Sequence, residues 1–224
     1  MQNNFILNQE YSKSNFFFET GHGSYVYSKK KKFLDLGYCA GTLLLGHNHK
    51  VLRESFKLLS KNKISNLAYA NYQSLELAKT LKKILPNYSK FIFCNSGTES
   101  VFKSLRLCKA LSGKKKIVSV TGSWHGSVDN TLYAPKKNLK PQKLSDGLSD
   151  DSRKNLVFVP YNDIKNSKKI LNKYKNKIQC VIIEPVQGCL PLSDVSEYLK
   201  FLENFCKKNN IILFFDEMIT GLRT

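Results

Sequence analysis

Two carboxylates, Asp216 and Glu217, directly follow the apolar run at residues 211–215. A continuous apolar run of this length is typical of a strand that is buried on both faces of a sheet. Burying an unpaired charge costs roughly several kcal/mol even after the protein relaxes, so we expect a positively charged partner beside Asp216. The alternative is that Asp216 only caps the segment that follows it.

A second group of polar side chains lies in the stretch FCNSGTES, where Gly97 turns the chain into a helix that starts at Thr98. A helix start presents free N–H groups and the positive end of the helix dipole, so it attracts anions. The hydroxyls of Ser96 and Thr98 add further donors. The stretch is therefore a candidate phosphate site, but an ordinary N-cap with Glu99 in the first turn would have the same sequence.

The stretch GSWHGS holds the only tryptophan of the chain, Trp124, beside His125 and between two glycines. Glycines let a ligand approach the backbone closely, and an indole offers a flat apolar face. The stretch is a candidate platform for a planar ligand. The alternative is that Trp124 only packs its loop against the core.

Other ligand-binding motifs are incomplete in this chain. A P-loop needs GxxxxGK[ST], but Cys108 and Lys115 stand where its first glycine and its hydroxyl residue belong. A dinucleotide fingerprint needs GxGxxG, but Val26 stands at its third glycine. His47 and His49 have no carboxylate or cysteine at ligand spacing, so we expect no metal site.

Taken together, the three groups describe a site for a planar, phosphorylated ligand with a protonated ring nitrogen. The helix start would take the phosphate, Trp124 would cover one ring face, and Asp216 would pair with the ring nitrogen. Pyridoxal 5'-phosphate has these three features, and its chemistry depends on a protonated ring. The positive partner that we expect beside Asp216 is then the pyridinium.

The segments that position these residues alternate between strands and helices from residue 90 onward, which predicts an α/β fold with a mainly parallel sheet and flanking helices. Ligands bind at the carboxyl ends of strands in such sheets, and Ser96, Trp124, Glu184 and Asp216 all lie at predicted strand ends or shortly after them. We expect strands at residues 90–94, 116–120, 156–159, 180–184 and 211–215, and helices at residues 49–60, 74–85, 98–111, 163–174 and 193–208.

The sequence also predicts two parts of unequal size. Residues 1–66 are expected to form an N-terminal hairpin and helix segment that belongs to a small domain, and residues 67–224 to form the large ligand-binding domain. The stretch GSYVYSKKKKFLDL predicts the hairpin, with two short strands around a Lys-rich turn. Residues 135–155 are polar and predict a long loop without regular structure, of the kind that often forms a functional flap.

The composition is that of a globular protein of 224 residues, 42% of them hydrophobic. No apolar run could span a membrane, and the first residues lack the basic start and apolar block of a secretory signal. The six cysteines form no CxxC pair, so we expect buried, reduced thiols in a cytoplasmic protein. The net charge of +19 comes mostly from Lys spread along the chain, which disfavours nucleic-acid recognition.

The sequence resembles the class III aminotransferases, which have fold type I of the pyridoxal-phosphate enzymes, and within them the glutamate-1-semialdehyde 2,1-aminomutase subgroup. The stretches that carry the resemblance occur in family order: FFFETGHGSYVYSKKKKFLDL, LLLGHNH, FCNSGTESVFKSLRLCKALSGKKKI, GSWHG, PYND, IIEPVQG and LFFDEMITGLR. The resemblance implies amino-group transfer between small-molecule donors and acceptors. It also implies a cytoplasmic homodimer whose active sites use residues of both subunits.

The resemblance assigns a role to each candidate residue. It implies that Asp216 binds the pyridine nitrogen, that Trp124 stacks on the ring with His125 beside it, and that Glu184 orients the site. Ser96, Gly97 and Thr98 would hold the phosphate. Asp216 and His125 are the two positions that the resemblance marks as catalytic.

The chain departs from the family pattern in two places. Cys189 stands where Glu or Asn is expected, and Ile219 stands where Gln or Met is expected. This leaves the aminomutase and an ω-aminotransferase of another substrate class both open. The family's Schiff-base lysine lies on a later strand, so we expect these residues to be the N-terminal part of a longer product. A catalytically inactive fragment is the remaining alternative.

Overall fold

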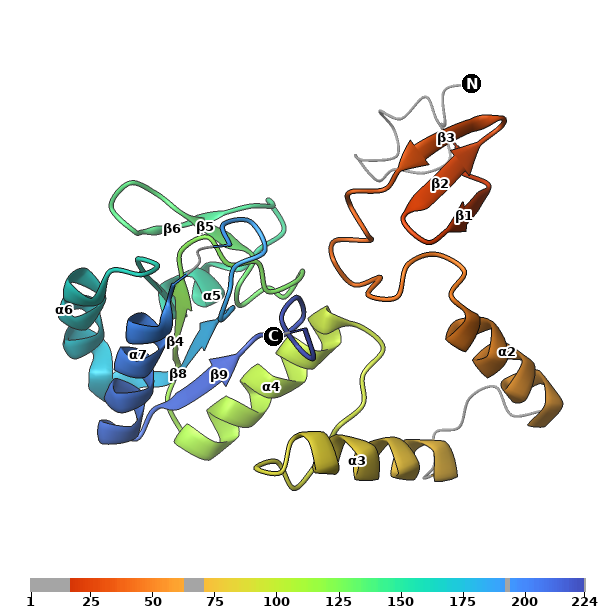
Figure 1. The fold of residues 1–224 in the computed structure, drawn as a ribbon. Helices are drawn as coiled ribbons and strands as arrows, with labels where there is room; N and C mark the ends of the chain where they lie inside the picture. The colour runs from red at the N-terminus through yellow and green to blue at the C-terminus, as the bar shows by residue number, and fades with distance from the viewer. Residues whose placement is uncertain (1–16, 63–70, 192–193, 224) are drawn as a thin grey trace. The chain divides into compact units, whose positions relative to one another are not determined.

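The computed structural model describes residues 17–62, 71–191 and 194–223 of the chain, which divides into two compact units (Figure 1). The first unit spans Met1–Ser89 and the second spans Lys90–Thr224. The predicted boundary between residues 66 and 67 falls in the stretch 63–70, outside the described residues. The division into domains 1–66 and 67–224 therefore stays a prediction.

The first unit begins with the antiparallel sheet β1-β2-β3, formed by Thr20–His22, Tyr25–Ser28 and Lys31–Leu34. The predicted hairpin is confirmed, because β2 and β3 pair around a turn in which Lys29 adopts a positive φ of 52°. Two helices follow, α2 at Lys50–Asn62 and α3 at Tyr72–Ile84. Asn71 caps α3 by accepting the Ser74 amide, and the helix ends before Pro86.

Asp35 organises the loop between β3 and α2. One oxygen accepts the backbone amides of Gly37 and Tyr38, both at 3.0 Å. The other lies 2.8 Å from His47 Nε2. These hydrogen bonds, the one from His47 first, hold the pKa of the Asp35 carboxyl below its usual value. His47 in turn fills the space beside Gly21, where an added Cβ would lie 2.7 Å from the ring.

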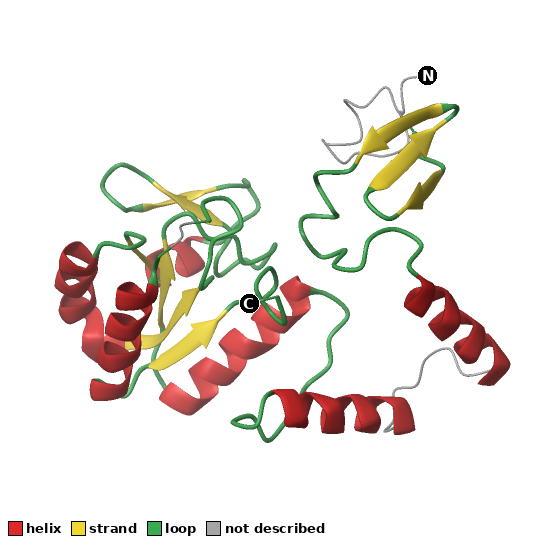
Figure 2. Cartoon of the chain, viewed as in Figure 1, coloured by secondary structure: helices red, strands yellow, loops and turns green. Residues whose placement is uncertain are grey.

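The second unit is built on a parallel sheet in the order β7-β4-β8-β9. Figure 2 shows the strands of this unit in yellow and its helices in red. Its strands are Leu156–Val159, Lys116–Val120, Ile178–Ile183 and Ile212–Phe215. The helices that connect and flank them are α4 at Gly97–Ser112, α6 at Ile164–Tyr174 and α7 at Ser196–Lys208. The α/β fold with a mainly parallel sheet is confirmed, and all six residues of the central strand β8 are buried.

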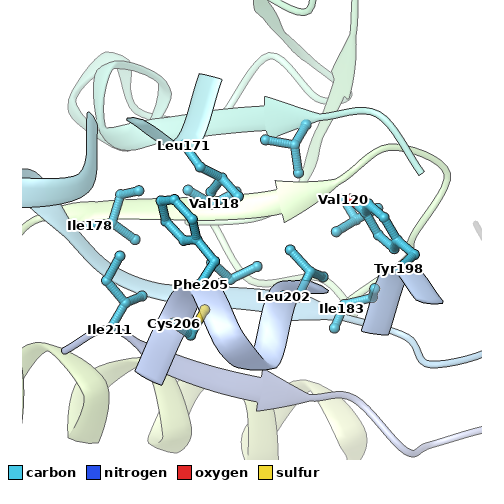
Figure 3. Packing of buried hydrophobic residues seen from close by; sticks show 12 residues of the cluster. Val118, Val120, Leu171, Ile178, Ile183, Tyr198, Leu202, Phe205, Cys206 and Ile211 are labelled. Carbon is cyan, nitrogen blue, oxygen red and sulfur yellow. The ribbon is translucent and has the colours of Figure 1, made fainter. Parts of the chain in front are cut away.

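Two apolar clusters cover the two faces of this sheet. On one face, α6 and α7 pack Leu171, Tyr198, Leu202 and Phe205 against Val118 and other strand residues (Figure 3). On the other face, Val101, Leu105 and Cys108 of α4 pack against Ile117, Cys180 and Ile182. Successive strand residues point to opposite faces, so the continuous apolar runs serve both clusters.

Helix α4 is the element that carries the candidate phosphate site, and both of its ends are capped. Ser96 Oγ accepts the Glu99 amide at 3.1 Å, while Glu99 Oε2 accepts the Asn95 amide at 2.9 Å, one residue before the N-cap residue whose amide a capping box would use. At the other end Gly113 takes the left-handed conformation with a φ of 64°. Gly113 therefore ends the helix, as its position in the sequence predicts.

The predicted strand at residues 90–94 does not form. The segment is irregular, and Ile92 is 73% exposed. A strand needs a neighbour to satisfy its N–H and C=O groups, and no described residue pairs with this segment. The apolar residues of this segment favour a strand, but local sequence does not show whether a neighbouring strand is available to pair with it.

The prediction that residues 135–155 lack regular structure is wrong. Tyr133–Pro135 (β5) and Pro141–Lys143 (β6) form an antiparallel pair, and Asp150–Asn155 form the short helix α5. Ser149 caps α5, with Asp150 and Asp151 in its first turn and basic residues in its last. The sequence therefore contains the cap and the charge pattern of a helix, but the polar composition of the segment favours a loop.

None of the helices among the described residues is both long and apolar enough to cross a membrane.

Tyr198 gives a test of the packing between α7 and α6. Its hydroxyl is fully buried, donates to Pro160 O at 2.8 Å and lies 3.0 Å from Ser167 Oγ. Burial raises the pKa of Tyr198 to about 12. Tyr198→Phe should lower the free energy of unfolding by about 1 kcal/mol, the usual net worth of one hydrogen bond. Urea unfolding measures this. Tyr88→Phe is the control because Tyr88 is 58% exposed, and equal effects of the two variants would contradict the expectation.

Asp35 predicts a pH dependence for the loop after β3. The pKa of the Asp35 carboxyl is lower in the folded protein than in the unfolded chain. Its contribution to stability is therefore fully present above the unfolded pKa and is lost as the pH falls through the folded pKa. Asp35→Asn should abolish this dependence. Hydrogen exchange of the Gly37 and Tyr38 amides between pH 5 and pH 2, corrected for intrinsic exchange, measures it. Equal pH profiles for the variant and the wild type would refute the role of Asp35.

Candidate functional site

The site lies at the carboxyl edge of the parallel sheet, where the loops after β4, β8 and β9 begin. Thr121, Glu184 and Asp216 are the first residues past these strands. The sheet ladder continues briefly into the loops, because the Thr121 amide donates to Val159 O and the Asp216 amide donates to Ile183 O, both at 2.8 Å. This continuation holds the starts of the loops after β4 and β9 in register with the neighbouring strands.

His125 and Asp216 form a buried pair at this edge. His125 Nδ1 lies 2.8 Å from Asp216 Oδ2, and the two side chains are 1% and 9% exposed. A carboxylate can only accept, so Nδ1 carries the proton. Asp216 Oδ1 accepts the Met218 amide at 3.2 Å. The sequence predicted a positive partner for Asp216, and within the chain its partner is His125, whose buried Nε2 has no hydrogen-bond partner among the described residues.

Glu184 holds the loop that carries Trp124. Its Oε1 accepts the Trp124 amide at 2.7 Å, and its Oε2 accepts the Gly188 amide at 3.0 Å. Glu184 is buried, whereas Trp124 is 56% exposed. The exposed indole argues against the alternative that Trp124 plugs its loop into the core. Its backbone is anchored while its ring remains accessible.

The start of α4 joins the same edge through close backbone contacts. Thr98 Oγ1 accepts the Ser127 amide at 3.2 Å, so its own proton remains free to donate. A Cβ added to Gly126, which has a φ of 74°, would lie 2.5 Å from Thr98 Oγ1. A Cβ on Gly97 would collide with Met218 Cε. Glycine is therefore required at position 126, where the φ is positive as well, whereas at position 97 the flexible end of Met218 would have to move aside.

Glu99, in the first turn of α4, pairs with Lys103 at 2.6 Å. This hydrogen bond, with a smaller contribution from the Asn95 amide, holds the pKa of the Glu99 carboxyl below its usual value. The ordinary N-cap that the sequence allowed is thus present. It leaves the other N–H groups of the first turn available to a ligand.

The structure brings the predicted residues together through a chain of contacts. Thr98 bonds the Ser127 amide, and Gly97 packs against Met218 beside the capping Ser96. His125 bonds Asp216, and the Trp124 amide bonds Glu184. Two residues depart from the family pattern. Cys189 is exposed, and Ile219 lies close to Gly188, because its Cγ1 would be 3.5 Å from a Cβ added to that glycine.

Sequence reasoning missed three contributors, Gln187, Met218 and Ser127. Each stands within three residues of one that it did select, but these side chains carry no chemical signature of their own. No group of three or more His, Cys, Asp or Glu among the described residues could hold a metal ion.

Chemically, the arrangement offers three complementary surfaces: donors for an anion at the start of α4, a flat face at Trp124, and a carboxylate at the end of β9. Residues 6–224 match the family model described as aminotransferase class-III. The chain is 33% identical over 211 residues to a glutamate-1-semialdehyde 2,1-aminomutase of Francisella philomiragia, covering 92% of this chain and 48% of that protein. It is also 33% identical to the aminomutase of Methanosphaera stadtmanae, covering 93% of this chain and 49% of that protein.

Solved structures show the same fold. A transaminase with PLP bound superposes with a TM-score of 0.83 at 25% identity, covering 92% of this chain and 49% of that one. A glutamate-1-semialdehyde aminomutase from Pseudomonas aeruginosa superposes with a TM-score of 0.77 at 19% identity, covering 90% and 45%. The chain therefore spans about half the length of the relatives it matches. Since the family model covers nearly every residue, this chain belongs to the class-III aminotransferase family.

Proposed function

We propose that the chain forms the cofactor-binding part of a pyridoxal-phosphate-dependent enzyme that transfers amino groups. The observation that carries the proposal is the buried His125–Asp216 pair, set at one sheet edge with the start of α4 and an exposed indole. Because the chain spans about half the length of its relatives, the activity is proposed for the whole protein.

The residues present fit the cofactor's phosphate. The first turn of α4 offers backbone N–H groups at the positive end of the helix dipole. Thr98 keeps a hydroxyl proton to donate, and Ser96 adds a second hydroxyl. Gly97 lets Met218 pack against the turn, so the backbone at the phosphate site is closely supported.

The residues also fit the ring. Trp124 would cover one face, with Glu184 fixing its backbone. Asp216 would accept the ring N–H, because a carboxylate has about four lone-pair positions and the chain fills only part of them. When bound, the cofactor supplies an electron sink for amino-group chemistry.

His125 has a positioning role in this proposal. By donating from Nδ1 it fixes the orientation of the Asp216 carboxylate without taking both oxygens. Its near-complete burial excludes water from that side of the pair. The carboxylate is therefore preorganised to receive a cationic N–H in a region of low polarity, where a charge-assisted hydrogen bond is strongest.

We further propose that the whole protein is an aminomutase of the glutamate-1-semialdehyde type, which both aminomutase relatives at 33% identity support. One observation favours an ω-aminotransferase instead: the segment EPVQG, with its buried Gln187, resembles the EPVQGE motif frequent in ω-aminotransferases more than the EPIVGN motif of the aminomutase. A cytoplasmic homodimer remains part of the proposal. We also propose that the Schiff-base lysine lies outside these residues. The chain alone would then not catalyse amino-group transfer.

Removing the carboxylate of Asp216 tests the cofactor site. Asp216→Ala should raise the dissociation constant of pyridoxamine 5'-phosphate about tenfold or more, because a charge-assisted hydrogen bond is lost. Pyridoxamine 5'-phosphate is the suitable probe because it has no aldehyde to react with surface lysines. Quenching of Trp124, the only tryptophan, reports binding.

Two variants sharpen this test. Asp216→Asn keeps the shape of the side chain and should weaken binding nearly as much, since the charge is what the ring nitrogen needs. Glu203→Gln removes an exposed carboxylate from α7 and should leave binding unchanged. Wild-type affinity in both Asp216 variants would refute the role of Asp216.

The substrate class can be tested on the whole protein. An aminomutase should convert glutamate-1-semialdehyde to 5-aminolevulinate without an external amino donor, because donor and acceptor carbons lie in one molecule. An ω-aminotransferase should instead need an external amine and a keto acid. Chromatography of the products with and without added alanine and pyruvate separates the two. A strict requirement for the added pair would contradict the aminomutase assignment.

A further inference from the structure

Gln187 is a polar side chain that the structure buries completely, in the loop after β8. Its Nε2 donates to Thr121 O at 2.7 Å and to Ser123 Oγ at 3.0 Å. Both acceptors belong to the loop after β4, directly before Trp124. A single amide therefore joins the two loops at the residues that lead into the indole.

The orientation of this amide follows from its surroundings. If the amide were flipped, its oxygen would face the carbonyl of Thr121, which can only accept. With Nε2 directed to Thr121, Gln187 Oε1 is buried and has no hydrogen-bond partner among the described residues. Gly122 makes room for that oxygen: its φ is 88°, and an added Cβ would lie 2.6 Å from Oε1.

A buried carbonyl without a partner is unfavourable, so Gln187 is not the residue that stability alone would select. Methionine has a similar length and volume and would bury no unpaired oxygen. The useful part of Gln187 is then its donor group. That group acts on the loop of Trp124 and touches no other described segment through a hydrogen bond.

We propose that Gln187 is a positioning residue that sets the orientation of Trp124. It fixes the loop at Thr121 and Ser123, while Glu184 fixes the Trp124 amide itself. Both holding residues come from the loop after β8, so this loop determines how the indole is presented. The consequence for cofactor affinity rests on the proposed function, whereas the positioning of the loop does not.

Hydrogen exchange on the ligand-free protein tests the positioning. Gln187→Met should speed exchange of the Trp124 amide about tenfold, which is the effect of losing one buried hydrogen bond of ordinary strength. Fluorescence anisotropy of Trp124 should fall as its loop loosens. The matched control is Gln179→Met, because Gln179 is another buried glutamine, 3% exposed, whose amide contacts Cys180 within β8. The control should leave Trp124 unchanged.

The amides of Val118 and Val181 in β4 and β8 distinguish positioning from general stabilisation. They should keep wild-type protection in Gln187→Met. The proposal is overturned if Trp124 exchanges as in the wild type, or if the strand amides lose protection by the same factor. Should Gln187→Met fail to fold, Ser123→Ala decides: it removes one of the two acceptors and should speed Trp124 exchange about threefold, since part of one hydrogen bond is lost. No change there would also overturn the proposal.

Ligand binding provides the second readout. Gln187→Met should weaken pyridoxamine 5'-phosphate about tenfold by Trp124 quenching, while Gln179→Met binds as the wild type does. If the loop loosens but affinity stays at the wild-type value, the positioning of Trp124 by Gln187 is supported, and its consequence for cofactor affinity is overturned. If the wild type itself binds no pyridoxamine 5'-phosphate, the proposed function fails, and the exchange result still decides the role of Gln187.

Discussion

The hydrogen bond between His125 and Asp216 joins segments that are 91 residues apart in the chain. It can form only if β4 and β9 lie parallel on either side of β8, with their carboxyl ends at the same edge. The pair is also nearly closed to solvent. A misplaced partner would leave a buried charge uncompensated. The register of three strands, the lengths of two loops and the burial of one imidazole are therefore all constrained by this contact.

The local structure could be predicted closely from the sequence. The strands at residues 116–120 and 156–159 match the structure, and the helix predicted at residues 98–111 is observed at Gly97–Ser112. These segments carry their own signals, namely apolar runs for buried strands and Ser96 and Gly113 as caps. The selection of Trp124, His125, Glu184 and Asp216 followed from the rule that ligands bind at strand ends. The structure places all four at that edge.

What the sequence could not reveal depends on partners that are distant in the chain. Residues 90–94 have the apolar character of a strand, but no described segment pairs with them. His125 gives no sign in the sequence that its partner is Asp216, because both the pairing and the burial arise from the sheet order. Gln187 is an uncharged residue in a loop, and only its burial against Thr121 shows that it holds another loop. The helix Asp150–Asn155 is different, since its N-cap Ser149 and the charges of its two ends are local signals that the sequence itself contains.

The parallel order of the sheet has a consequence for biosynthesis. His125 leaves the ribosome 91 residues before Asp216, which at about 5–20 residues per second is a delay of roughly 5 to 18 s. During that interval β4 can pair with β7 and then β8, but the imidazole faces an unfinished edge. Of the four described strands of this sheet, β9 is synthesised last, so its carboxylate meets the imidazole only after β4, β7 and β8 have all left the ribosome.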